Sequence, residues 1–375
     1  MKRLVGLLLF VLLFIGVGTG CDQEPNQNNE ETWTLGPFHR PEGVNPVIVP
    51  EDTSTFDCPM RDSTIHWEAM ATFNPAAVVR NGKINVLYRA EDRLGQMKIG
   101  GHTSRVGRAR SEDGLSFERD DEPVMYPDHD DQKKYEWPGG TEDPRLVETE
   151  EGRYVMTYTQ WNRDTPRLAV ATSDDLEDWT KHGPAFENAY DGKYLDMDTK
   201  SGAIVTRREG DHLVATKIDG KYWMYWGVPK IYLATSDNLK DWKPVENDEG
   251  NLDPVLTPRK GHFDSWLVEA GPPALITDEG ILVIYNAANS AKTGDPAVVD
   301  SAYAGGQALY DREELAKLVK RTDKPFIKPE EPYERSGQYT SGTTFLEGLA
   351  HFNNRWFIYY GTADSRVGVI ATNPE

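Results

Sequence analysis

Three acidic residues of this chain stand immediately before short segments that contain proline or glycine. Asp143 precedes Pro144, Glu269 precedes an Ala-Gly-Pro-Pro segment, and Glu347 precedes Gly348. Hydrolysis of a glycosidic bond needs two carboxyl groups around one pocket, an acid that protonates the leaving oxygen and a base that activates water. Each residue could instead be structural, because an Asp-Pro pair often starts a turn and a glutamate at a rim can simply be solvated.

Repeated strands are the elements that must position these residues. A turn followed by a strand that ends in an aromatic residue occurs at Gly82–Tyr88, Gly152–Tyr158, Gly220–Trp226, Gly280–Tyr285 and Asn354–Tyr360. Runs of β-branched and aromatic residues between Gly, Asp and Asn turns are typical of strands, and repeated sets of about four strands are typical of propeller blades. We therefore expect an all-β fold, a single five-bladed β-propeller over residues 36–375.

A second repeat predicts how the ring of blades closes. It is a short apolar segment opened by proline, and its copies are Pro123-Val124, Pro184-Ala185, Pro254-Val255, Pro325-Phe326 and, at the other end of the chain, Pro46-Val47. An outermost strand tolerates proline, because its missing N–H is not needed there. The N-terminal segment is therefore expected to supply the outer strand of the last blade. The one helix that we expect is a short connecting helix over Arg312–Lys320.

The inner strand of each blade lines the axis of a propeller, so side chains at the starts of these strands should converge on one pocket. Reading back from each repeat places the following residues there: Asn74, Asp143 with Arg145, Glu269, Glu347, and either Lys200 or Asp211-His212. An oligosaccharide is the expected partner of this pocket.

The first residues predict export. Lys2 and Arg3 precede an apolar run from Leu4 to Val17, and small residues lead into Cys21. A run of this length with a charged start is typical of a signal peptide rather than a membrane span. We expect a lipoprotein signal peptide over residues 1–20, lipidation at Cys21 and a flexible polar tether over residues 21–35, which gives a periplasmic or cell-surface protein held to the membrane only by its lipid. The alternative is an ordinary signal peptide with an incidental cysteine.

Composition excludes several classes of function. The net charge is −20, which would repel nucleic acid phosphates and anionic lipid heads but leaves neutral sugars unaffected. Cys21 and Cys58 are the only cysteines, so neither a disulfide framework nor a thiolate zinc site is expected. No metal-ligand spacing is present in the sequence, and no cofactor is expected.

Four motif regions follow one another between about Asn45 and Thr372. They are Phe73-Asn74-Pro75-Ala76 with Leu87-Tyr88-Arg89-Ala90-Glu91-Asp92, then Gly140-Thr141-Glu142-Asp143-Pro144-Arg145, Gly220-Lys221-Tyr222-Trp223-Met224-Tyr225-Trp226-Gly227, and Tyr359-Tyr360-Gly361-Thr362-Ala363-Asp364-Ser365-Arg366. In this order they resemble glycoside hydrolase family 130, which comprises β-mannoside phosphorylases and β-1,2-mannosidases.

The resemblance implies roles for individual residues. Asp143 would be the general acid, acting through a hydroxyl of the sugar, and Glu269 would occupy the place of a candidate base in the hydrolytic members. The −1 sugar would be held by Asn74, Arg89, Asp364 and Arg366. One position departs from the hydrolytic members, which tend to carry a second glutamate after Tyr-Trp-Gly where this chain has Val228.

Three functions remain open at this point. The first is an inverting, exo-acting glycosidase on β-mannosides, including β-1,2-linked manno-oligosaccharides. The second is a β-mannoside phosphorylase, which would need basic side chains around a phosphate; candidates are Lys200, His212, Lys217 and Arg163. The third is a glycan-binding lipoprotein without activity. Export weighs against the phosphorylase, because a sugar phosphate made outside the cytoplasm would be lost to the cell.

Overall fold

A computed structural model describes residues 33–96 and 98–374 of the chain. Its contacts separate Met1–Trp33, nearly all of which lies outside the described residues, from one compact unit, Thr34–Glu375. The expected signal peptide, Cys21 and most of the expected tether therefore lie outside the described residues. Within the described part, no helix has the length and apolar character needed to cross a membrane.

The regular secondary structure of the compact unit is almost entirely antiparallel strand, as expected. The helical elements of the described residues are single turns: α1 (Lys133–Glu136), η1 (Ala189–Gly192) and η2 (Pro332–Glu334). After a hairpin of β1 (Phe56–Cys58) and β2 (Ser63–Ile65), the strands form five successive groups. The first two groups are β3 (Ala71–Arg80), β4 (Lys83–Gly95), β5 (His102–Ser111), β6 (Glu118–Arg119), and β7 (Gly140–Glu148), β8 (Tyr154–Trp161), β9 (Pro166–Ser173), β10 (Thr180–Pro184).

The remaining three groups follow the same antiparallel pattern with more interruptions. The third is β11 (Gly202–Glu209), β12 (His212–Ala215), β13 (Lys217–Ile218), β14 (Lys221–Trp226), β15 (Tyr232–Ser236) and β16 (Trp242–Pro244). The fourth is β17 (Leu267–Ala270), β18 (Ala274–Ile276), β19 (Ile281–Ala288), β20 (Tyr303–Tyr310) and β21 (Leu318–Arg321). The fifth is β22 (Thr344–Phe352), β23 (Arg355–Thr362) and β24 (Arg366–Ala371).

Aromatic residues at the ends of the repeated strands form the core of each group. All five are at most 1% exposed: Tyr88, Tyr158, Trp226, Tyr285 and Tyr360. Glycine in the neighbouring strand makes room for the ring in several groups, and a β-carbon at Gly306 would lie 2.3 Å from the ring of Tyr285. The repeat visible in the sequence therefore marks the packing of an aromatic ring against the neighbouring strand, as Tyr285 of β19 packs on Gly306 of β20.

The proline-opened segments occupy the outer edge of the five groups, as expected. In each, the residue after proline donates its backbone N–H to a carbonyl in, or directly before, one strand of the group: Val124 to Val106 at 2.8 Å, Ala185 to Leu168 at 2.7 Å, Val255 to Ile231 at 2.8 Å, Phe326 to Gly305 at 3.0 Å and Val47 to Val367 at 2.9 Å. The displaced copy at Val47 thus pairs with the last group, although the two lie at opposite ends of the chain.

Additional contacts fasten this N-terminal segment to β24. The N–H of Val367 donates to the carbonyl of Ile48 at 2.9 Å. The side-chain amide of Asn45 donates to the carbonyl of Val369 at 2.8 Å and accepts from the N–H of Val369 at 2.7 Å. This pair of hydrogen bonds is the one that a residue of a neighbouring strand would make. His39 forms a further bridge with Ala371.

The expected helix over Arg312–Lys320 is wrong. The carboxylate of Asp311 accepts the N–H groups of Glu313 and Glu314, which closes a turn, and the chain then enters strand β21 against β20. Local side-chain bonding to the backbone competes here with helix formation, and sheet pairing takes the rest of the segment.

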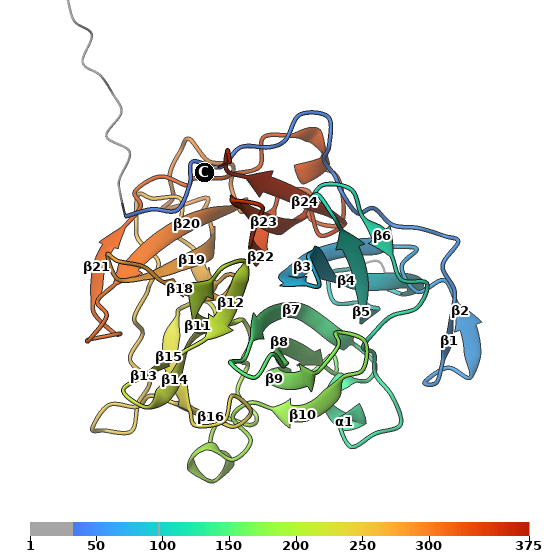
Figure 1. The fold of residues 1–375 in the computed structure, drawn as a ribbon, viewed down its shortest axis with the longest axis horizontal. Helices are drawn as coiled ribbons and strands as arrows, with labels where there is room; N and C mark the ends of the chain where they lie inside the picture. The colour runs from blue at the N-terminus through green and yellow to red at the C-terminus, as the bar shows by residue number, and fades with distance from the viewer. Residues whose placement is uncertain (1–32, 97, 375) are drawn as a thin grey trace, which may run out of the picture. The chain divides into compact units, whose positions relative to one another are not determined.

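The first strands of the groups meet near the middle of the unit (Figure 1). Short parallel bridges join neighbouring groups, between Ser104 and Gly140, between Glu148 and Val214, and between Val205 and Ala274. Side chains at the starts of these strands are thereby brought together from all five groups.

Candidate active site

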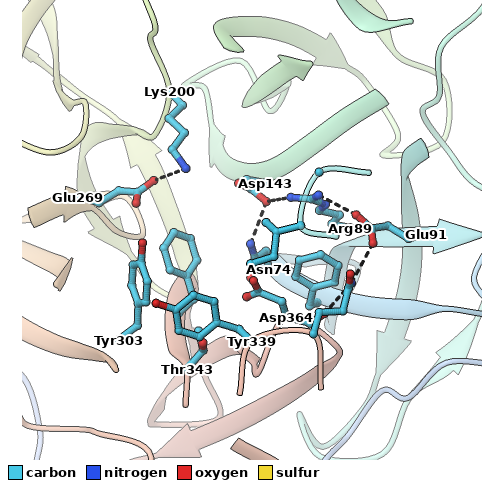
Figure 2. Close-up of a pocket in the computed structure, with 15 residues that line it drawn as sticks. Asn74, Arg89, Glu91, Asp143, Lys200, Glu269, Tyr303, Tyr339, Thr343 and Asp364 are labelled. Atoms are coloured by element: carbon cyan, nitrogen blue, oxygen red, sulfur yellow. Dashed lines mark hydrogen bonds and ion pairs between the residues drawn. The ribbon is translucent and has the colours of Figure 1, made fainter. Parts of the chain in front are cut away.

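A cavity of about 210 Å³ lies where the inner strands begin. Figure 2 shows Asp143, Arg89 and Glu91 toward one side of it and Lys200 with Glu269 toward the other. Every group of strands contributes to the lining, which consists of Phe73, Asn74, Arg89, Glu91, Ile99, Gly100, Asp143, Lys200, Glu269, Tyr303, Gln338, Tyr339, Thr343, Phe345 and Asp364.

Asn74 and Asp143 are aimed into the cavity by irregularities of their strands. The register of β3 against β4 shifts between Phe73 and Pro75, and that of β7 against β8 shifts between Glu142 and Arg145. Both residues have positive φ, 47° at Asn74 and 51° at Asp143. Asn and Asp are the residues other than glycine that adopt this conformation most readily, and bulges commonly redirect side chains beside active sites. Asp143 therefore lies in a bulged strand and not in a connecting turn.

Arg89 organises the acidic side of the cavity. Its guanidinium lies 3.1 Å from Asp143 Oδ1, 2.7 Å from Glu91 Oε1 and 2.8 Å from Glu142 Oε1. The amide of Asn74 donates a further hydrogen bond to Asp143 at 2.9 Å. One cation is thus shared among three buried carboxyl groups, so this side of the site has excess negative charge.

The carboxyl groups around Arg89 differ in protonation. Burial alone would raise the pKa of Asp143, but Arg89, Lys200 and the Asn74 amide outweigh it, so the pKa of Asp143 lies below its usual value. Burial raises the pKa of Glu142 to about 7, against the opposing effect of Arg89. The pKa of Asp364 is also raised by burial to about 7. Asp143 is therefore ionised at neutral pH, while Glu142 and Asp364 titrate near pH 7.

Glu269 lies on the opposite side and has its own partners. Lys200 Nζ lies 3.2 Å from Glu269 Oε1, and the hydroxyl of Ser201 donates to the same oxygen. Burial would lower the pKa of Lys200, but Glu269 and Asp143 outweigh it, so Lys200 stays charged. Tyr303 stands beside Glu269 in the cavity wall (Figure 2). The site thus presents an ionised acid candidate facing a buried base candidate across a small space.

Three residues expected in the pocket lie outside its lining. Arg145 and Glu347 are buried and form an ion pair at 2.9 Å. Arg366 donates to the carbonyl of Ser336 at 2.6 Å. None of these three residues is part of the cavity lining. For Arg145 and Glu347, the register shifts beside Asp143 and Glu347 change which side chains of the strand face inward.

Of the four basic candidates for a phosphate site, Lys200 lines the cavity, and the other three are not part of its lining. His212 pairs with Glu148 at 2.6 Å, and Lys217 stacks on the ring of Tyr222. Arg163 donates to the carbonyl of Gly101 at 2.8 Å. Val228, at the position of the second glutamate of hydrolytic members, is likewise absent from the lining.

Several lining residues were not predicted from the sequence. Glu91 could have been found, since it lies two residues after Arg89 in one strand and therefore shares its face. Of the others, Tyr303 and Phe345 lie in β20 and β22, and the rest come from connecting segments. Gln338 donates to Glu91 at 2.9 Å and Tyr339 to the carbonyl of Ser301 at 2.7 Å, contacts with no signal in the sequence. Among residues 33–96 and 98–374, no cluster of His, Cys, Asp and Glu is arranged to hold a metal ion.

Comparison with known proteins decides the family. The model of glycoside hydrolase family 130, described as β-1,4-mannooligosaccharide phosphorylase, matches residues 44–375. This chain belongs to glycoside hydrolase family 130. Homologues in this family act on β-mannosides, and the chain is an enzyme of the same kind.

Relatives within family 130 include both phosphorylases and hydrolases. A 1,2-β-oligomannan phosphorylase of Thermoanaerobacter sp. (strain X514) is 33% identical over 81% of this chain and 90% of its own length. A glycosyl hydrolase from Bacteroides ovatus is 51% identical, with a TM-score of 0.89 over 92% of this chain and 95% of that one. A further structure, presented with glycoside hydrolases of the family that target β-1,2 mannosidic linkages in Candida mannan, is 53% identical, with a TM-score of 0.90 over 91% and 95% of the two chains.

Proposed function

We propose that this family 130 enzyme is an inverting, exo-acting hydrolase of β-mannosides, including β-1,2-linked manno-oligosaccharides. The observation that carries the proposal is the pair of buried carboxylates, Asp143 and Glu269, on opposite sides of one small cavity. An inverting hydrolase needs such a pair about 6.5–9.5 Å apart, because one water must fit between the base and the sugar. The small cavity volume favours removal of one terminal sugar at a time.

In the proposed reaction, Glu269 accepts a proton from water as the water oxygen bonds to the anomeric carbon. The glycosidic C–O bond breaks, and the leaving oxygen receives a proton that Asp143 supplies through a sugar hydroxyl. The lowered pKa of Asp143 keeps it ionised at neutral pH, so it must gain a proton when sugar binds. Glu142 and Asp364 hold protons near neutral pH beside it and can provide one. A bound sugar also displaces water, which raises the pKa of a buried carboxylate.

The charges around the cavity favour water over phosphate as the attacking group. The cations of the lining are Arg89, which already contacts three carboxylates, and Lys200, which is paired with Glu269. A phosphate site requires basic side chains with free donors, and an incoming phosphate would be repelled by Glu269. A phosphorylase is the second candidate, since the curated relatives are phosphorylases. A glycan-binding protein without activity is the third, and the presence of both carboxylates argues against it.

Product analysis tests the proposal. The mature protein is incubated with β-1,2- and β-1,4-linked manno-oligosaccharides, with and without inorganic phosphate, and the products are followed by NMR. We expect free mannose released with inverted anomeric configuration at a rate that phosphate does not increase. Formation of mannose 1-phosphate would establish the phosphorylase instead, and the absence of any turnover would favour the binding protein.

The architecture and location are parts of the same proposal. The five strand groups, each with a proline-opened outer segment, support a five-bladed propeller in which the N-terminal segment closes the ring on β24. The apolar run before Cys21 and the polar residues after it support an exported lipoprotein, anchored by its lipid in the periplasm or at the cell surface.

A further inference from the structure

The guanidinium of Arg145 connects the strands that carry the two candidate catalytic carboxylates. Its Nη1 donates to the backbone carbonyl of Asp143 at 3.2 Å. Its Nε donates to the carbonyl of Gly271 at 2.8 Å, and its Nη2 donates to the carbonyl of Ala270 at 3.0 Å. Ala270 directly follows Glu269, so a single side chain holds the backbone at both carboxylates.

The surroundings of Arg145 make this connection rigid. The residue is 2% exposed, and Glu347 beside it is fully buried. The two form an ion pair at 2.9 Å, and the Glu347 carboxylate has no hydrogen-bond partner among the described residues. Burial raises the pKa of Glu347 well above its usual value, and Arg145 opposes this by favouring the ionised form. The two groups are therefore coupled, and removing Glu347 alone would leave the buried guanidinium without its ion-pair partner, which is strongly destabilising.

The strand that carries Glu347 is fixed to the same region by a second contact. The side chain of Asn286 accepts the N–H of Leu346 at 2.7 Å and donates to its carbonyl at 2.9 Å. Asn286 lies opposite Glu269 in the β17–β19 register. Strands β7, β17 and β22 are thus joined beneath the cavity by hydrogen bonds and one ion pair.

We propose that Arg145 is a positioning residue that sets the separation of Asp143 and Glu269. This inference rests on the proposed function, since the separation matters only if one carboxylate protonates the leaving group while the other activates water. A guanidinium is suited to the task because its planar fork presents five donors in fixed directions. Lysine would keep the charge, but its three donors share one nitrogen and do not match the fork by which three different nitrogens of Arg145 reach the three carbonyls.

The test compares Arg145→Lys with the double variant Arg145→Met/Glu347→Gln, which removes both charges and leaves none unpaired. A misplacement of about 1 Å can cost about a hundredfold in rate, so we expect kcat to fall by about that factor in both variants with KM little changed. Arg108→Lys is the matched control. Arg108 is 5% exposed and ion-paired with Asp120 at 2.6 Å, but it does not line the cavity. The kcat of the Arg108→Lys enzyme should therefore equal that of wild type.

Double-mutant cycles separate positioning from a merely structural role. If Arg145 acts through the carboxylates, adding Arg145→Lys to Asp143→Asn, or to Glu269→Gln measured at its azide-supported rate, should cause no further loss of rate, because the separation no longer matters. Additive losses in either background, or a wild-type kcat in Arg145→Lys, would overturn the role of Arg145 alone. Full activity of Glu269→Gln would instead overturn the proposed function on which this role depends.

Discussion

Arg89 Nη1 lies 3.1 Å from Asp143 Oδ1, and the Asn74 amide lies 2.9 Å from the same oxygen. This arrangement stabilises the ionised form of Asp143 and lowers the pKa of its carboxyl group. Burial raises the pKa of the neighbouring Glu142 and Asp364 to about 7. For the general-acid role proposed above, Asp143 must therefore gain a proton when substrate binds.

Asp143→Asn is expected to retain the fold and substrate affinity but lose turnover by about a hundred- to ten-thousand-fold, which is the contribution typical of general acid catalysis. An amide keeps the hydrogen bond to Arg89 but cannot supply a proton. The measurement is kcat on manno-oligosaccharides, compared with kcat on an aryl β-mannoside whose acidic phenol leaves without assistance. The loss should be much smaller on the aryl substrate; equal losses on both would remove the acid role.

Glu269→Gln is expected to abolish hydrolysis, because an amide cannot accept the proton of the attacking water. Added azide should partly restore turnover with inversion, since azide needs no base. Glu347 cannot substitute, because it lies outside the cavity lining and faces Arg145. Anomeric configuration and rate are followed by NMR, and substantial hydrolysis without azide would show that another group is the base.

Stability should depend on pH through Glu142 and Asp364. Their pKa values are about 7 in the folded protein, above their ordinary values of 4.5 and 3.8. The folded state then binds more protons than the unfolded chain, so their contribution to the free energy of unfolding is largest at low pH and is lost as pH rises through about 7. We expect Asp364→Asn to gain stability relative to wild type between pH 5 and pH 8 in urea titrations. The exposed Asp248→Asn should show no such change, and a parallel response of both variants would contradict the assignment.

Asn45→Ala tests the N-terminal pairing. It removes two hydrogen bonds to the backbone of Val369 and leaves a partly buried carbonyl unpaired, at a cost of about 1–3 kcal/mol. The free energy of unfolding is measured in urea, with the exposed Asn373→Ala as control. Deletion through Val49 should destabilise the whole domain, because it exposes the edge of β24. Equal stability of the deletion variant and wild type would contradict a closing role for this segment.

Cys21→Ala is expected to release soluble protein or leave uncleaved precursor, because the acylated residue is lost. Membrane and soluble fractions are compared by immunoblot. Cys58→Ala is the matched control, since Cys58 is buried in the compact unit and should leave membrane association unchanged. Unchanged association of the Cys21 variant would point to a different anchor.

The sequence by itself determined the strand groups, the outer segments and the family. Each strand group needs the same turns, the same buried aromatic residue and the same outer segment. Residues that serve these needs, such as Tyr285 and Pro46, therefore recur along the chain. Asn74, Asp143 and Glu269 could be predicted as pocket residues because they stand at the starts of inner strands. The failed helix over Arg312–Lys320 shows the limit of local pattern, since a side-chain turn at Asp311 and pairing with β20 override it.

Only the tertiary structure decided which side chains face the cavity and what charge they carry. One extra residue in a bulge changes the face to which the following side chains of the strand point. The side chain of Asp143 therefore enters the cavity, whereas those of Arg145 and Glu347 lie outside its lining. Gln338 and Tyr339 come from a connecting segment that no repeat covers. The ionisation of Asp143 depends on Arg89 and Lys200, which lie 54 and 57 positions away in the chain, and proximity across that separation exists only after folding.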